Sequence, residues 1–474
     1  MTARTPSRHW ALPHCYALIF LIIVLMGALT WVVPSGQFER ESVRAADGST
    51  HMVVRPGTYH EVPKHSATGD LRQGVGDILS APARGVAGAV DVVVFVLILG
   101  GVFGILVRTR ALDRGLRAIS AKAGTRVELV LPLLIILLSL GGSTFGMSEE
   151  ALPLYAVLLP LLFRQGYDSM TTVLVLFLST QVGYIASTIN PFTVIIAQSL
   201  SGLTGDPHLQ LRALVWLGLT GAEIVFVMAY ARRVRRAPQT SLVYASDQHT
   251  RTLFTTPEGE TDVLSRQDWI ILAGFILMLG VMVWGLTTRG WFTLEIGALF
   301  LGFALAAGTV ARLGLNGMAD AFAEGCRDFV YPAFVIGLGR GILVMADRGM
   351  IIDTILNAMN GFLHCLPNYA VTTAVLAAHN VITLLVPSSS GEAALTMPVM
   401  APLAGLTGIG KDTLVLAYQF GNGLINTVSP TSPVLMASLA LARIEFGQWL
   451  KVVLPFILAA WLACALLLAI FAHL

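Results

Sequence analysis

Three glutamates stand in otherwise apolar stretches of the chain, where a charged side chain is costly. Glu149 and Glu150 follow a run of small and polar residues, and Glu392 follows a similar run. A carboxylate inside a bilayer costs at least about 2.5 kcal/mol on insertion scales, so these acids are expected to have a role. Each also begins a predicted helix, whose N-terminus stabilises a negative charge by up to about 1 kcal/mol. They could cap helices, carry a proton, ligate Na⁺ or pair with an amino group of a substrate.

Small and polar residues interrupt four apolar segments, two in each half of the chain. In two of these interruptions a proline follows Asn190 or Ser429, where it removes a backbone donor and biases the preceding residue away from helix. Unpaired backbone at membrane depth is tolerated only inside protein or beside a water-filled cavity. Each interruption is therefore predicted to be a helix break or the tip of a re-entrant hairpin. The interruptions cover residues 141–150, 187–193, 387–392 and 426–433.

Together the four interruptions form the predicted site, because freed carbonyls can coordinate a cation and helix N-termini can bind an anion. A small carboxylate-bearing solute is the expected ligand, with Na⁺ or H⁺ as a possible coupling ion and no cofactor or other metal. The expected substrate-binding residues are Ser148, Glu149, Glu150, Asn190, Pro191, Thr193, Ser388, Ser389, Ser390, Gly391, Glu392, Pro430, Thr431 and Ser432. A coupling cation is expected at Gly146, Ser187, Asn190, Asn426 and Ser429.

Further polar residues lie in apolar segments of the second half. Asn380, Gln419 and Asn422 could line the solute path. A histidine in an apolar helix, such as His379, is more often a hydrogen-bonded packing residue than a proton relay. Arg340 could meet a substrate carboxylate or pair with a buried glutamate, and the sequence leaves both interpretations open.

The elements that position these residues are predicted from composition. Of 474 residues, 55% are hydrophobic and 12% are charged, about half the charged fraction of a soluble domain. The net charge of +2 gives no general attraction to nucleic acid. Walker, HExxH and GxSxG motifs are absent from the sequence, and the four cysteines form no CxxC pair. The chain is therefore expected to be a polytopic integral membrane protein, not an enzyme.

Charge placement predicts the topology. Residues 11–33 are long and apolar enough for an uncleaved first spanning helix. An external loop follows over residues 37–73, with the turn formers Asp47-Gly48 and Pro56-Gly57. A second helix over about residues 87–107 leads into a basic cluster at 108–126, and another basic cluster lies at 232–236. By the positive-inside rule both clusters face the cytoplasm. The N-terminus is then cytoplasmic, in a multi-pass protein of the cell inner membrane.

The two halves of the chain carry the same landmarks in the same order. Residues 104–107 read Gly-Ile-Leu-Val and recur at 341–344, and the pair Glu150-Ala151 recurs as Glu392-Ala393. Charge placement gives the halves opposite orientations, which is typical of secondary transporters. The predicted units are a first inverted repeat (1–233), a cytoplasmic linker (234–268), and an extra spanning helix with the second inverted repeat (269–474).

Several of these stretches carry a resemblance to a known family. They are Pro13-His14, the run from Thr30 to Phe38, Gly146 to Glu150, Val386 to Gly391 with Met397 to Leu403, and Pro430 to Ser432. There the sequence resembles the YfcC branch of the C4-dicarboxylate anaerobic carrier (DcuC-like) family, in the ion transporter superfamily. The resemblance runs nearly end to end. It implies an all-α protein with two inverted repeats, each with a re-entrant hairpin and a broken transmembrane helix.

The resemblance also implies elevator-like motion, frequent homodimers and ion-coupled transport of small carboxylates or, in some members, arginine–ornithine exchange. Two departures concern substrate charge: Glu392 stands where a neutral or basic residue is expected, and Asn422 where an Asp is expected. Three acids suit a zwitterionic or cationic amino acid, or a dianion if protons or Na⁺ neutralise them. The predicted function is an ion-coupled secondary active transporter of a C4-dicarboxylate or amino acid. The alternatives are a basic amino-acid exchanger without bulk ion coupling and a channel.

Overall fold

The computed structural model describes residues 15–44, 50–66, 69–111, 114–115, 127–203, 208–254, 264–289, 291, 293–364, 366–407 and 409–471. Within these ranges the chain is helical apart from short strands between the first two helices. The turn signal Asp47-Gly48 and most of the basic cluster at 108–126 lie outside the described residues.

The elements of the first half begin with an apolar helix that lies within the span predicted over residues 11–33. The segment after α7 continues through a π-helical turn, η3, into α8 as one helix. The elements are α1 (Cys15–Val32), β1 (Gly36–Gln37), β2 (Arg40–Arg44), β3 (Thr50–Val54), β4 (His60–Glu61), β5 (His65–Ser66), β6 (Gly69–Asp70), α2 (Val75–Gly88), α3 (Val90–Thr109), α5 (Val127–Phe145), η2 (Glu149–Leu154), α6 (Tyr155–Arg164), α7 (Ser169–Val173), η3 (Leu174–Leu178), α8 (Ser179–Ile185), η4 (Pro191–Ile195), α9 (Ile196–Leu200) and α10 (Leu209–Arg236).

The linker and the second half follow α10. The extra helix expected from residue 269 is observed as α12, and the amphipathic stretch before the second Gly-Ile-Leu-Val run is part of the long helix α14. The elements are η5 (Pro238–Thr240), α11 (Tyr244–Phe254), α12 (Arg266–Arg289), α13 (Thr293–Val310), α14 (Gly314–Arg348), α15 (Ile352–His364), α16 (Asn368–Leu385), α17 (Ser389–Thr407), α18 (Lys411–Asn426), α19 (Pro433–Leu441) and α20 (Phe446–Phe471).

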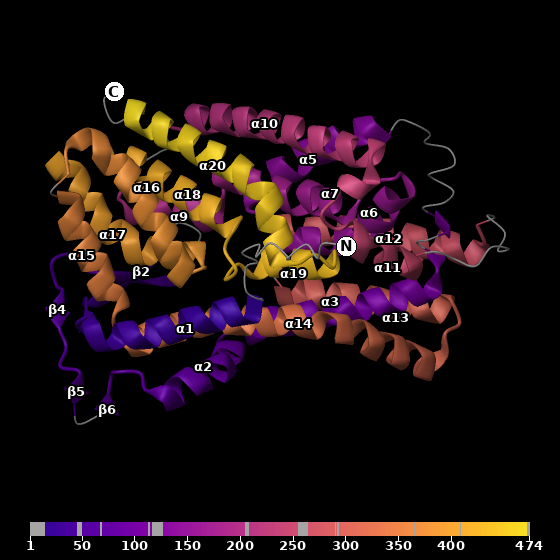
Figure 1. Cartoon of the computed structure of the whole chain (residues 1–474), viewed down its shortest axis with the longest axis horizontal. Helices are drawn as coiled ribbons and strands as arrows, with labels where there is room; N and C mark the ends of the chain where they lie inside the picture. The colour runs from indigo at the N-terminus through magenta and orange to yellow at the C-terminus, as the bar shows by residue number, and fades with distance from the viewer. Residues whose placement is uncertain are drawn as a thin grey trace, which may run out of the picture.

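The helices pack in two groups. In the first group α14 lies against α1, α2 and α3, and α13 lies against α3; these helices run together along one long side of the molecule (Figure 1). In the second group α8 lies against α5, α10 and α18, while α16, α17, α18 and α20 pack on one another. The helix α19 also packs against α20 and so belongs to the second group. Its contact with α14 is the principal helix–helix contact between the two groups.

Glycines allow the close approach of helices in the first group. A Cβ at Gly85 of α2 would overlap the carbonyl oxygen of Gly337 in α14, and one at Gly104 of α3 would overlap that of Ala321. Inside a membrane no hydrophobic effect drives helices together, so they associate through close backbone packing of this kind. The glycines therefore explain why α2 and α3 both pack along α14.

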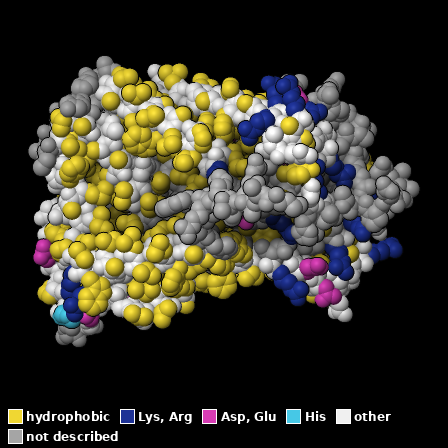
Figure 2. Space-filling model, viewed as in Figure 1, with side chains coloured by type: hydrophobic (Ala, Val, Ile, Leu, Met, Phe, Trp, Pro, Cys, Tyr) yellow, Lys and Arg dark blue, Asp and Glu magenta, His cyan; other side chains and the backbone are white. Residues whose placement is uncertain are grey.

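Hydrophobic side chains cover the middle of the molecular surface. Figure 2 shows them across the face, with charged side chains at the two ends. Among the described helices, four are long and apolar enough to cross a membrane: the span Phe329–Arg348 within α14, and the helices α3, α10 and α20. Large exposed hydrophobics such as Leu21, Val225, Ile276 and Leu466 suit contact with lipid chains.

The loop over residues 37–73 forms three short antiparallel ladders, with Gly36 opposite Glu61, Arg40 opposite Val54 and His65 opposite Asp70. Gly57, with φ +76°, supplies the left-handed turn residue predicted from Pro56-Gly57.

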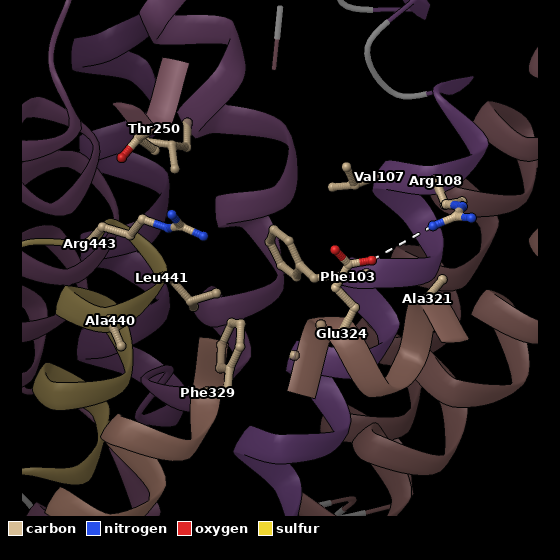
Figure 3. A pocket seen from close by; sticks show the side chains of 14 residues that line it. Phe103, Val107, Arg108, Thr250, Ala321, Glu324, Phe329, Ala440, Leu441 and Arg443 are labelled. Atoms are coloured by element: carbon tan, nitrogen blue, oxygen red, sulfur yellow. Dashed lines mark ion pairs between the residues drawn. The ribbon is translucent and has the colours of Figure 1, made fainter. Parts of the chain in front are cut away.

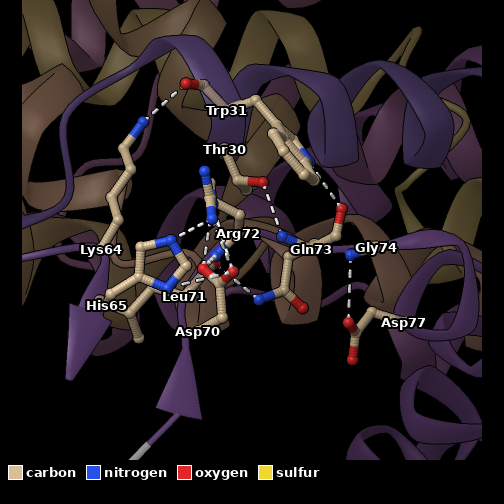
Figure 4. Close-up of polar contacts among 10 residues, drawn as sticks. All are labelled: Thr30, Trp31, Lys64, His65, Asp70, Leu71, Arg72, Gln73, Gly74 and Asp77. Carbon is tan, nitrogen blue, oxygen red and sulfur yellow. Dashed lines mark hydrogen bonds and ion pairs between the residues drawn. The ribbon is translucent and has the colours of Figure 1, made fainter. Parts of the chain in front are cut away.

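Side-chain contacts tie this loop to the helices. The Gln73 N–H donates to Thr30 Oγ1 (2.9 Å), and Lys64 donates to the Trp31 carbonyl (2.8 Å), as Figure 4 shows. Arg40 pairs with Asp353 of α15 at 2.9 Å. The described part of the loop therefore lies as a cap over one end of the molecule (Figure 1).

The linker docks onto the first half through buried carboxylates. Asp168 accepts hydrogen bonds from Tyr230 (2.8 Å) and Ser241 (2.6 Å). Asp247 of α11 accepts from the N–H (2.9 Å) and hydroxyl (2.6 Å) of Ser169. Burial raises the pKa of Asp247 to about 6, and the hydrogen bonds from Ser169 only partly offset that effect. The helix α11 is thus held by specific polar contacts.

Candidate functional site

All four predicted interruptions are breaks between helices, and they converge on one cavity. The chain leaves helix between α5 and η2, between α8 and η4, between α16 and α17, and between α18 and α19. The cavity has a volume of about 210 Å³. This is below the roughly 300–1,000 Å³ of pockets for drug-sized ligands, which suits a small metabolite. Its lining residues are Gly146, Ser148, Glu149, Glu150, Gln181, Tyr184, Phe192, Pro387, Ser388, Ser389, Ser390, Asn426, Ser432, Pro433 and Val434.

The first break places two adjacent carboxylates at the cavity. Gly146 has φ +74°, a conformation that favours glycine, and the chain turns there from α5 into η2. Glu150 is buried and accepts a hydrogen bond from the Ser148 N–H at 2.8 Å. Gln181 of α8 donates to Ser148 Oγ at 3.2 Å. The break is therefore held in shape by its own carboxylate and by the neighbouring helix.

The third break presents hydroxyls at the start of α17. Tyr184 of α8 donates to Ser389 Oγ at 2.6 Å, and Tyr418 of α18 donates to the Ser389 carbonyl at 2.7 Å. Ser388 Oγ accepts from the Gly391 N–H at 3.4 Å. The serines at 388–390 thus lie at a helix N-terminus, where N–H groups and hydroxyls favour an anionic group.

The second break lies mostly behind the cavity wall. Asn190 is buried and accepts from the Phe192 N–H at 2.9 Å, while its amide donates to Ser187 Oγ at 3.3 Å. Arg212 of α10, only 1% exposed, donates to the Thr188 carbonyl at 3.1 Å. One of the carbonyls freed by this break therefore already faces a guanidinium.

The fourth break is held by hydroxyls. Ser429 Oγ lies 2.6 Å from Thr431 Oγ1 and accepts from the Thr431 N–H at 3.1 Å. Thr431 also touches the first helix group, since a Cβ at Gly339 of α14 would lie 3.6 Å from Thr431 Cβ. Of this break, Asn426 and Ser432 line the cavity.

The remaining predicted site residues are distributed around the cavity without lining it. Glu392 is fully buried in a cluster with His379, Thr383 and Asn422. Thr193 is buried, and the side chain of Pro191 lies outside the described residues. Among the described side chains, the predicted residues that do not line the cavity are Ser187, Asn190, Thr193, Gly391, Glu392, Ser429, Pro430 and Thr431.

Two of the other candidate polar residues are engaged elsewhere. Asn380 donates to the Gly421 carbonyl at 2.6 Å and accepts from Trp461 at 2.8 Å. Arg340 lies beside Gly88 of α2, with its Cγ 3.5 Å from a Cβ built there. Arg340 therefore belongs to the first helix group and not to the cavity.

A second cavity, of about 230 Å³, separates the two helix groups. Phe103 of α3 and Phe329 of α14 face Leu441 and Arg443 at the end of α19 across it (Figure 3). An ion pair between Arg108 and Glu324, 3.7 Å apart, lies at its edge. Its lining is largely apolar, so it is a gap between packed helices and lacks the polar groups of the first cavity.

The charge of the first cavity is one-sided. Glu149 and Glu150 line it, and among its described lining residues there is no lysine, arginine or histidine. A cationic group entering the cavity would meet two carboxylates, whereas a free dianion would meet like charge. The arrangement favours a solute with at least one positive group.

Comparisons with known proteins show which family the chain belongs to. A family model described as C4-dicarboxylate anaerobic carrier (DcuC) matches residues 12–473. The chain belongs to this family. A relative in Escherichia coli (strain K12), named "Putative basic amino acid antiporter YfcC", is 36% identical and the match covers 95% of this chain and 94% of that protein. A protein of Haemophilus influenzae is 30% identical, with 99% of each chain covered. This member of a transporter family, with its apolar helices, is a multi-pass membrane protein.

Solved transporter structures were also compared with the chain. The YdaH transporter of Alcanivorax borkumensis aligns with a TM-score of 0.41 at 15% identity, covering 97% of this chain and 98% of that chain. MtrF of Neisseria gonorrhoeae aligns with a TM-score of 0.40 at 16% identity, covering 98% and 96%.

Sequence reasoning missed several residues of this region. Gln181 and Tyr184 line the cavity from α8, which follows the apolar turn η3, and polar residues after that apolar run could have revealed them. Glu223, fully buried in α10 and bonded to Ser179 at 2.8 Å, carried the signal of an acid inside a spanning helix. Phe192, also in the lining, carried no such signal.

Proposed function

We propose that this protein is a secondary active transporter that carries a basic amino acid, bound in the cavity where the four helix breaks meet. The observation that supports this proposal most is the pair Glu149 and Glu150 in a cavity without a described basic lining residue. The Escherichia coli relative, named as a basic amino acid antiporter, supports the same solute class.

The two ends of an amino acid would be held by different parts of the cavity. The side-chain cation and the α-amino group would meet the carboxylates of the first break. The α-carboxylate would meet hydroxyls and N–H groups at the starts of α17 and α19, around Ser389 and Ser432. Charge-assisted hydrogen bonds of this kind contribute about 1.5–3 kcal/mol each.

A C4-dicarboxylate is the second candidate, and the description of the family favours it. A dianion in this cavity requires that protons or Na⁺ neutralise the two glutamates. A coupling cation near Asn190 and Ser429 remains part of that alternative. At the second break, however, the guanidinium of Arg212 already donates a hydrogen bond to the Thr188 carbonyl. This contact disfavours Na⁺ at that carbonyl.

The architecture proposed with this function has two inverted repeats, 1–233 and 269–474, joined by a cytoplasmic linker over 234–268. The breaks at α5–η2 and α16–α17 would be the tips of re-entrant hairpins. The helix group around α14 would stay fixed while the group that holds the cavity moves, as in an elevator. Placement in the inner membrane as a homodimer, with a cytoplasmic N-terminus, completes the proposal.

Counterflow in proteoliposomes tests the proposed solute. Vesicles containing the purified protein are loaded with unlabelled arginine, ornithine, succinate or buffer, and uptake of labelled arginine or, in parallel, labelled succinate is followed without an ion gradient. We expect internal arginine or ornithine, but not succinate, to accelerate a saturable uptake. Saturable succinate counterflow without arginine counterflow would instead support the dicarboxylate carrier. A flux that neither saturates nor accelerates would indicate a channel.

A further inference from the structure

A buried carboxylate lies one layer behind the cavity, surrounded by hydrogen-bond donors. Glu392 of α17 is fully buried, and Thr383 Oγ1 of α16 donates to its Oε2 at 2.7 Å. The amide Nδ2 of Asn422 in α18 donates to the same oxygen at 2.8 Å, and His379 Nδ1 lies 2.7 Å from Oε1. A buried carboxylate needs such donors to offset the loss of water. Both oxygens of Glu392 therefore act as acceptors.

This carboxylate fixes the orientation of the Asn422 amide. An asparagine amide has a nitrogen that donates and an oxygen that accepts. The reverse orientation of Asn422 would place its Oδ1 against Glu392 Oε2, so that two acceptors faced each other. Because Nδ2 must face Glu392, Oδ1 faces the cavity wall. There Oδ1 accepts from Ser389 Oγ at 2.7 Å and from Asn426 Nδ2 at 3.2 Å, and both of these residues line the cavity.

Two hydroxyls in the cavity wall continue this chain of hydrogen bonds. A hydroxyl has one hydrogen to donate, and Ser389 gives its hydrogen to Asn422. Tyr184 of α8 in turn gives its hydrogen to Ser389 Oγ at 2.6 Å. Each bond in the chain therefore donates away from the cavity and towards the buried carboxylate. Both hydroxyls line the cavity, and each has only lone pairs left for a solute.

The wall that a solute meets is therefore rich in acceptors. The lone pairs of Tyr184 and Ser389 belong to the same cavity as the carboxylates of Glu149 and Glu150. Ammonium and guanidinium groups only donate hydrogen bonds, so they complement this wall. A solute carboxylate only accepts, and the hydrogens of these two hydroxyls are already used. In an amino acid, the carboxylate would instead meet the N–H groups at the start of α17.

We propose that Glu392 is a positioning residue that selects solutes rich in N–H donors without touching them. Its carboxylate holds the Asn422 amide in one orientation, and that amide makes acceptors of the two hydroxyls in the cavity wall. The inference rests on the proposed function for the identity of the solute, whereas the direction of the hydrogen bonds rests on the contacts of Glu392. Without this carboxylate the amide can turn round, and the hydroxyls can then donate into the cavity.

Glu392→Gln tests this role, because glutamine has a similar size and can itself donate. Calorimetry measures binding of arginine and of succinate to purified full-length wild type, E392Q and E392Q/N422D. We expect E392Q to bind arginine about tenfold more weakly, as after loss of one charge-assisted hydrogen bond, and to lose preference for arginine over succinate. The double variant should recover that preference, because a carboxylate at position 422 again accepts from Ser389. An unchanged preference in E392Q, or a lost preference in a folded double variant, would overturn the role.

Loss of charge alone also weakens cation binding, and a double-mutant cycle separates this effect from the orientation of the hydroxyls. Arginine affinity is compared among E392Q, S389A and E392Q/S389A, and S390A replaces S389A in a matched control cycle. Ser390 lines the cavity from the same turn of α17, and no hydrogen bond joins it to Asn422 in the described structure. We expect non-additive effects for the Ser389 cycle and additive effects for the Ser390 cycle. Additive effects in both cycles would overturn the proposal.

The same variants distinguish a failure of this inference from a failure of the proposed solute. If wild type binds succinate and not arginine, the proposed solute is wrong. The positioning role then requires tighter succinate binding in E392Q, because the freed hydroxyls can donate to a carboxylate, and unchanged or weaker binding would overturn it. Thermal unfolding without any solute gives a further readout. We expect E392Q and S389A to lower the melting temperature non-additively, and additive shifts would contradict the chain of hydrogen bonds.

Discussion

At the residue scale, Glu149 and Glu150 are adjacent in sequence but differ in their surroundings. Glu150 is 6% exposed and is tied to the backbone of its own break through the Ser148 N–H. Glu149 is partly exposed at the cavity. Glu150 is therefore expected to shape the first break, and Glu149 to meet the solute directly.

Replacing Glu149 by Gln should weaken arginine binding about tenfold or more. The substitution keeps the size of the side chain but removes a charge-assisted hydrogen bond of about 1.5–3 kcal/mol, and 1.4 kcal/mol corresponds to a factor of ten. Isothermal calorimetry on purified E149Q measures the change. Exposed Glu445 offers the control E445Q, which should bind as wild type does. An unchanged Kd in E149Q would remove Glu149 from the solute site.

At the element scale, packing of the first group depends on glycines as well as on buried apolar side chains. The Gly85 contact with α14 involves the carbonyl of Gly337 and the backbone of Gly341, neither of which can move away without shifting a helix. By contrast, a Cβ at Gly218 of α10 would meet no atom within 4 Å. The same substitution to alanine is therefore expected to have opposite effects on stability at Gly85 and at Gly218.

Gly85→Ala should destabilise the protein by about 1–3 kcal/mol, as overpacking of a tight contact does. Gly218→Ala should leave stability unchanged or raise it slightly, since alanine favours helix over glycine by up to about 1 kcal/mol. Thermal unfolding of both variants in the same detergent measures the difference. Equal melting temperatures for G85A and wild type would contradict the close packing of α2 on α14.

At the scale of the whole molecule, the two helix groups contact each other where α14 packs against α19, and the second cavity lies between them beside this contact. Thr431, which belongs to the fourth break, touches Gly339 of α14. If the group carrying the substrate cavity moves during transport, this contact must open. The position of one residue pair therefore reports on the motion of the whole molecule.

Cross-linking Gly339→Cys to Thr431→Cys should stop transport reversibly. The Cβ separation of 3.6 Å is within the range of about 3.5–4.5 Å for a disulfide. In a background without the four native cysteines, oxidation should reduce arginine counterflow to that of empty vesicles, and a reductant should restore it. Each single-cysteine variant, oxidised in parallel, is the control. Full counterflow in the oxidised double variant would contradict relative motion of the two groups at this contact.

Much of the architecture followed from local features of the sequence. Apolar length predicted α1, α3 and α12, because a helix satisfies its own backbone whatever surrounds it. The prolines after Asn190 and Ser429 and the run of small and polar residues over 141–150 predicted breaks that the structure confirms, since proline restricts the backbone and removes a donor locally. Family membership was likewise predicted and is confirmed.

The sequence by itself determined that this is a polytopic helical protein of a transporter family with four polar helix breaks. Only the tertiary structure decided which polar side chains meet. Tyr184 and Ser389 are 205 positions apart and share a hydrogen bond, whereas Glu392 lies behind the cavity against His379. Helical breaks arise from neighbours along the chain, but side-chain contacts depend on how each helix is rotated and packed, which no single segment encodes.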